Sequence, residues 1–187
     1  MAAGVKISVR HELRALSRDL KRVHRKHVEP AARAALNRTG GSVRSVAVKE
    51  VARESGIKQK DVRGAVKLDK ARKGGPLRAE IQGRGRPLNL IRFAARQLKK
   101  GVSAKPWNKK RVYGRGAFID NDGRTVFKRT GAGRLPIRGM YGASIATELV
   151  RDAVAAAVRK QFGERWPVEF KRAFEQAMKR GLPRRKS

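Results

Sequence analysis

The sequence lacks cysteine and has few acidic residues and few aromatics. Without cysteine, the 187-residue chain can form no disulfide, no thiolate zinc site and no thiol nucleophile. No apolar stretch reaches the roughly 18 residues that a membrane-spanning helix needs, so we expect no membrane partner. Residues 1–12 have no apolar run typical of a secretory signal, so we expect no secretory signal peptide there.

The shortage of acidic residues leaves a strongly positive chain. There are 48 Lys and Arg against 15 Asp and Glu, a formal net charge of +33. Charge of one sign repels itself in a compact body and favours a polyanion nearby. Nucleic acid is the usual polyanion, because each neutralised phosphate releases a counterion. The apolar content of 40% is sufficient for one folded core at this length.

The positive charge is concentrated in the middle of the chain. Residues 82–115 contain eleven Lys or Arg and no Asp or Glu, interleaved with the apolar residues Leu88, Leu90, Ile91 and Phe93. A solvated basic tail would have nothing to bury, so the pattern predicts an ordered element with cations on its outer face. The candidate nucleic-acid-facing residues are Arg84, Arg86, Arg92, Arg96, Lys99, Lys100, Lys105, Lys109, Lys110 and Arg111.

Two aromatics in the same segment, Trp107 and Tyr113, have two possible roles. They could stack on exposed bases. The commoner role for such side chains is packing, here against the predicted sheet.

Helical patterns dominate the first third of the chain. Apolar spacing predicts a helix over about 11–27, after a short strand or lead-in at 4–9. An Ala-rich helix should follow, with Pro30 in its first turn, a kink or break at Gly40-Gly41 and a stop at Gly56. A short helix is expected at about 58–64.

Strand patterns follow. Alternation predicts a strand at 77–82, and the basic segment should mix strand and loop. Residues 117–119 and 125–127 flank a turn of Asn121, Asp122 and Gly123, which predicts a β-hairpin. Residues 131–139 are expected to form an extended loop.

The last third is again helical. Ser144 can cap a helix that continues to Phe162 and ends at Gly163, and Pro167 suits the first turn of a final helix. We therefore expect an α+β fold: N-terminal helices, a central mostly antiparallel sheet with basic loops, and C-terminal helices packing on the sheet. Residues 1–187 should form one domain with an N-terminal helical arm (about 10–56) and a basic flexible tail (about 180–187).

Residues suited to catalysis or metal binding are scarce. His24 and His27 are three apart, but His11 is the sole further imidazole, and two surface histidines are the better interpretation. Asp120 and Asp122 resemble part of a calcium loop without its glutamate, and hairpin turn chemistry explains them better. We expect no catalysis, no metal and no cofactor.

One segment allows a different function. Residues 51–67 resemble a helix-turn-helix, with Gly56 in the turn and an inward face of Ala52, Ile57, Val62, Ala65 and Val66. Lys58, Gln59, Lys60 and Arg63 would then probe a major groove. This alternative describes a free nucleic-acid-binding protein, although two short helices around a glycine are also common packing units.

Five segments, in order along the chain, resemble the prophage minor tail protein Z family of lambda-like long-tailed phages. They are AALNRT (34–39), GIKQKDVR (56–63), GRPLNLIRFAARQLKKGVS (85–103), GAFI (116–119) and RLPIRGMYGASI (134–145). The similarity runs from about residue 10 to 175. Gly40-Gly41 departs from the uninterrupted Ala/Arg-rich helix expected in that family.

The resemblance implies a structural virion protein that acts late in tail assembly. It would complete the tail at its head-proximal end and join it to the head, after assembly in the host cytoplasm. The implied partners are five further copies in a hexameric ring, tail terminator or tail tube proteins, the head connector, and phage DNA. A ring around a DNA conduit would place the basic residues against phosphate without base readout.

Overall fold

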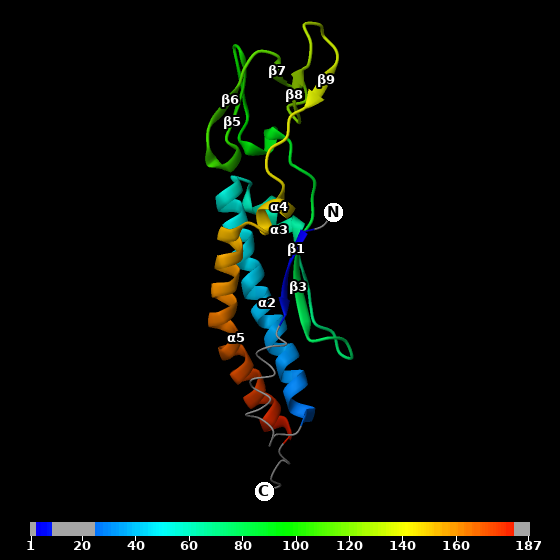
Figure 1. Cartoon of the computed structure of the whole chain (residues 1–187), viewed down its shortest axis with the longest axis vertical. Coiled ribbons are helices and arrows are strands. Elements are labelled where there is room, and N and C mark those ends of the chain that lie inside the picture. The colour runs from blue at the N-terminus through cyan, green and yellow to red at the C-terminus, as the bar shows by residue number, and fades with distance from the viewer. Residues whose placement is uncertain (1–2, 9–24, 182–187) are drawn as a thin grey trace.

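The computed structural model describes residues 3–8 and 25–181, which form an elongated body (Figure 1). Two long helices, α2 (Arg25–Ser55) and α5 (Asp152–Gly181), lie side by side along most of its length. One three-stranded sheet lies beside them, and two smaller sheets form the end of the molecule away from the C-terminus. The α+β fold class is confirmed.

The helical pair is held by a lower core of small and aromatic side chains. From α2 it buries residues spaced three or four apart, which form a continuous stripe: Ala31, Ala32, Ala35 and Leu36. From α5 it receives a ladder of aromatics at intervals of four, Phe162, Trp166, Phe170 and Phe174, with successive ring centroids 5.8, 5.5 and 6.0 Å apart. Small residues on α2 allow the large rings of α5 to approach closely.

The predicted break at Gly40-Gly41 is wrong, because α2 runs through both glycines. Gly40 is buried at a close approach to the sheet, where an added Cβ would lie 3.1 Å from Leu68 Cδ1 and 3.8 Å from Ala79 Cβ. The glycine therefore provides room for packing. The predicted end at Gly56 is confirmed: its φ is +75°, and its N–H donates to Ala52 O at 3.1 Å.

The prediction that Pro30 lies in a first helical turn is wrong, since α2 begins at Arg25 and Pro30 lies within it. The helix expected at about 11–27 falls mostly outside the described residues, as do the end of the basic tail and His24. The short helix expected at 58–64 is confirmed as α3 (Gln59–Ala65).

The C-terminal helices are interrupted at a different place from the one predicted. The break falls at residues 150–151, between α4 (Ile145–Leu149) and α5, and α5 continues through Gly163 and Pro167. Both residues are exposed, so water can pair the backbone group that proline leaves free, while the aromatic ladder crosses the same turns. Ser144 occupies the N-cap of α4, but its hydroxyl donates to Gly85 O at 3.3 Å instead of capping the helix.

The sheet beside the helical pair has the strand order β1-β3-β2 and is antiparallel. Its strands are β1 (Ala3–Ser8), β2 (Val66–Asp69) and β3 (Arg78–Gly83). The strand predicted at 77–82 and the short strand suggested at 4–9 are confirmed within one residue. On β3, Ala79 and Ile81 are buried while Arg78 is exposed, as the alternation indicated.

The central segment forms two further antiparallel sheets, so the predicted single sheet is three separate ones. The first contains β4 (Arg96–Leu98), β5 (Gly101–Ala104) and β6 (Arg111–Tyr113), and the second β7 (Ala117–Ile119), β8 (Val126–Arg129) and β9 (Ile137–Gly139). The predicted hairpin is confirmed by the pairing of β7 with β8. Two 3-10 helices complete the segment, η1 (Leu90–Phe93) and η2 (Pro106–Asn108).

Asn89 fastens η1 to β8. Its Oδ1 accepts from Ile91 N at 3.1 Å and from Val126 N at 2.8 Å, and its Nδ2 donates to Val126 O at 3.1 Å. The side chain thereby caps η1 and pairs with the N–H of Val126, which is fully buried and whose C=O also accepts from Met140 N at 2.8 Å. This connection sets the position of η1 relative to the β7–β8 hairpin.

The two adjacent glycines of α2 should respond differently to substitution. Gly41→Ala should raise the free energy of unfolding by about 0.5–1 kcal/mol, because alanine favours helix and nothing lies within 4 Å of the added Cβ. Gly40→Ala should gain less, because its Cβ presses on Leu68. Urea denaturation followed by circular dichroism measures both, and equal gains would contradict the close packing at Gly40.

Removal of the Asn89 side chain should destabilise the end formed by the small sheets. Asn89→Ala leaves the N–H of buried Val126 without its partner, whereas the Val126 C=O still accepts from Met140 N at 2.8 Å, so the free energy of unfolding should fall by about 1–3 kcal/mol. The control is Asn121→Ala in the exposed β7–β8 turn, expected to change it by less than about 0.5 kcal/mol. Similar losses in both variants would show that Asn89 is not the fastening.

Candidate nucleic-acid interface

All ten predicted nucleic-acid-facing side chains are exposed. Arg84 and Arg86 lie between β3 and η1, Arg92 lies on η1, and the remaining seven follow the first small sheet and its connections: Arg96, Lys99, Lys100, Lys105, Lys109, Lys110 and Arg111. The sequence predicted cations outside and apolar groups inside, and the burial of Leu90 and Phe93 at 1% exposure confirms the second part. Contact with nucleic acid stays a prediction.

The cations of the first small sheet lie on either side of a fully buried central strand, β5. All four residues of β5 are buried, and its neighbours β4 and β6 present Arg96 and Arg111 to solvent. The turn from β4 to β5 contains the exposed Lys99 and Lys100. The sheet therefore holds these charges on a rigid base at the end of the molecule away from the C-terminus (Figure 1).

Trp107 and Tyr113 are both half-buried and pack against the hydrophobic core, which confirms the packing role. Trp107 Nε1 donates to Glu148 Oε1 at 2.8 Å, and the Arg111 guanidinium lies 5.4 Å from the centre of the indole ring. Trp107 therefore already has partners on its edge and on its ring face.

Glu148 is a residue that the sequence analysis missed. Its side chain is 1% exposed, accepts from Trp107, and pairs with Arg151 Nε at 3.0 Å. Buried carboxylates need such partners. Glu148 joins α4 to η2 through Trp107, and because the two residues are 41 positions apart in sequence, no local pattern could have indicated the pair.

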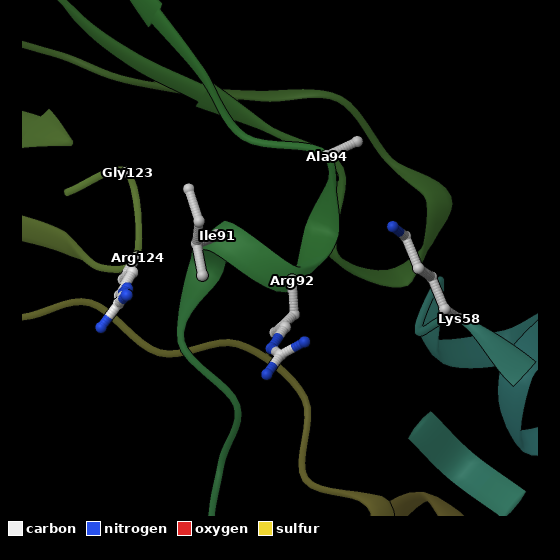
Figure 2. Close-up of a pocket in the computed structure, with 6 residues that line it drawn as sticks. All are labelled: Lys58, Ile91, Arg92, Ala94, Gly123 and Arg124. Carbon is white, nitrogen blue, oxygen red and sulfur yellow. The ribbon is translucent and has the colours of Figure 1, made fainter. Parts of the chain in front are cut away.

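An open hollow lies between α3, η1 and the β7–β8 turn (Figure 2). Its volume is about 540 Å³, and its lining residues are Lys58, Ile91, Arg92, Ala94, Gly123 and Arg124. Figure 2 shows Lys58 and Arg124 on opposite sides of η1, with Arg92 between them. Of these three cations, the sequence predicts Arg92 as a site residue and Lys58 only in the helix-turn-helix alternative. Arg124 is not predicted, because it follows Arg92 by 32 residues and reaches the hollow only through the β7–β8 turn.

The helix-turn-helix alternative receives mixed support. Ile57, Val62 and Val66 are buried, as that pattern requires. However, α2 has 31 residues and packs along α5, whereas α3 has only seven. Asp61 on α3 pairs with Arg92 at 3.7 Å, so η1 flanks the short helix, which lies in the middle of the molecule (Figure 1). This arrangement does not favour insertion of α3 into a groove.

Within residues 3–8 and 25–181, no three His, Cys, Asp or Glu side chains group together as metal ligands would. The Asp120 carboxylate instead accepts from Arg124 N at 2.7 Å and from Thr125 N at 2.9 Å, which confirms the hairpin-turn interpretation. None of the helices in that part of the chain has the length and apolar character of a membrane span.

Comparison with known proteins supports the resemblance seen in the sequence. The family described as "Prophage minor tail protein Z (GPZ)" matches residues 13–184, which is nearly the whole chain. Comparisons with curated proteins and with solved structures give no match. The matched range includes α2 to α5 and all ten candidate cations, and on this evidence the chain belongs to the prophage minor tail protein Z family.

Proposed function

We propose that this minor tail protein acts in tail completion and head–tail joining, with its basic face next to the DNA conduit. Membership of the family places it among the structural components of the virion tail. We further propose that the chain acts as one tail-completion domain at the head-proximal end of the tail. It would be assembled into the tail in the host cytoplasm. The observation that carries it is the exposure of all ten cations of residues 84–111 on a folded base.

The chemistry of this surface suits phosphate better than bases. Arginine and lysine neutralise phosphates without regard to sequence. The two aromatics that could have stacked on bases are half-buried against the core. Non-specific contact is what a conduit needs, because DNA of any sequence has to pass it.

Contacts with protein neighbours are supported by a second surface. Leu135, Ile137 and Tyr141, on and beside the edge strand β9, are 71%, 37% and 62% exposed. Exposed apolar side chains at an unpaired sheet edge are typical of protein interfaces. We propose that this edge contacts either another copy in a homohexameric ring, or the tail terminator, tail tube or head connector.

The cations of the first small sheet should be required after the tail has reached full length. We expect Arg96→Glu, Lys99→Glu and Lys100→Glu together to lower infectious titre by about 100-fold or more, because each copy loses three phosphate contacts and repels DNA instead. Complementation of a phage lacking this gene, followed by electron microscopy, should reveal full-length tails that fail to join heads or to eject DNA.

A matched control separates position from total charge. Arg159→Glu, Lys160→Glu and Arg165→Glu make the same change on exposed residues of α5. This variant should retain most of the titre. Equal loss in both variants, or shortened tails in the first, would contradict the proposed role.

A further inference from the structure

The hollow between α3, η1 and the β7–β8 turn combines three cations with an apolar wall. Lys58, Arg92 and Arg124 come from three separate segments, and Ile91 and Ala94 add apolar surface (Figure 2). Its volume of about 540 Å³ falls within the range of small-ligand sites, roughly 300–1,000 Å³. A short backbone segment therefore fits, in which each of the three cations can contact a different phosphate.

We propose that this hollow binds a phosphodiester segment of the DNA backbone. The inference rests on the proposed function and deepens it, because it assigns a defined binding site to a surface argued so far from charge alone. Cations of one sign around a concave surface concentrate their field within it. None of the described residues that line the hollow is acidic, so nothing among them competes directly for the phosphate.

The nearest acidic contact leaves Arg92 available. Asp61 Oδ2 lies 3.7 Å from Arg92 Nη1, which is an ion pair without a hydrogen bond. The Arg92 side chain is 60% exposed. A guanidinium has five N–H donors, so Arg92 can bond a phosphate while it stays close to Asp61.

The three cation-bearing segments are fixed before any ligand arrives. Asn89 ties η1 to β8, and the Asp120 carboxylate accepts from Arg124 N and Thr125 N, which closes the β7–β8 turn. Lys58 O accepts from Asp61 N at 2.9 Å and thereby begins the first turn of α3. Cations on a fixed backbone lose less freedom on binding, so these contacts support affinity.

The lining also indicates what the hollow does not read. Its polar side chains are all cations, without the amide that reads adenine or the carboxylate that reads cytosine, and a group of three cations matches the charge of phosphates better than the single guanine edge that Arg or Lys can read. Ile91 and Ala94 can contact a sugar. The hollow therefore suits a sequence-independent segment of backbone.

The test measures the salt dependence of DNA binding by the full chain. A fluorescent random-sequence duplex is titrated with wild type and with the triple variant Lys58→Gln, Arg92→Gln, Arg124→Gln across a chloride series. Each lost phosphate contact reduces the slope of log K against log salt by about 0.9, so the triple variant should lose about 2–3. The single variant Arg124→Gln should reduce the slope by about 0.9. Because Arg124 lies in an exposed turn, this variant should fold normally and keeps the test valid if the triple variant misfolds.

The control removes three exposed cations from α5: Lys171→Gln, Arg172→Gln and Lys179→Gln. It should lose less than about 1 in slope. Equal losses in the control and hollow variants, or an unchanged slope in both hollow variants, would overturn the assignment of the hollow and leave the proposed function standing. If wild type itself showed no salt-dependent binding, the proposed function would fail as well.

Two further arms identify the ligand. Millimolar inorganic phosphate or AMP should displace the duplex no better than chloride of equal ionic strength. Stronger displacement would identify a free-phosphate site and overturn the assignment to DNA. A hollow variant that keeps the wild-type slope but no longer enters tails would show that the hollow holds an acidic neighbouring protein, which would also overturn it.

Discussion

Burial of the apolar side of the central segment makes a dense cationic surface possible. Leu90, Phe93 and Val102 are at most 1% exposed, although the cations on either side of them face solvent. Each such side chain contributes about 1.5–3 kcal/mol when fully buried. Two exposed like charges 4 Å apart repel by only about 1 kcal/mol in water. Packing beneath the surface therefore outweighs repulsion across it, and the charges stay in fixed places.

The polar connections complete this arrangement because they join segments that are distant in sequence. Asn89 links η1 to β8, and Glu148 links α4 to η2 through Trp107. The helical pair of α2 and α5 extends away from both. The molecule thus has a cationic end built on small sheets and a long helical part.

Sequence patterns were sufficient where structure is local. The strand at 78–83, the short helix α3 and the hairpin of β7 and β8 follow from alternation, helical spacing and turn residues. They failed where packing overrides propensity: Gly40 makes room for Leu68, and the aromatic ladder continues across Gly163 and Pro167. The basic hollow could not be foreseen, since Lys58, Arg92 and Arg124 meet only through the tertiary fold.

The central claim is that residues 82–115 form the DNA-facing surface of a particle component. Cryo-electron microscopy of intact virions tests this claim most directly, because it shows both the position of the protein and the side that faces the channel. The account predicts a six-copy ring at the head-proximal end of the tail, with β4, β5 and η1 nearest the DNA. Density for this chain at the distal tip, or a ring with α5 lining the channel, would contradict it.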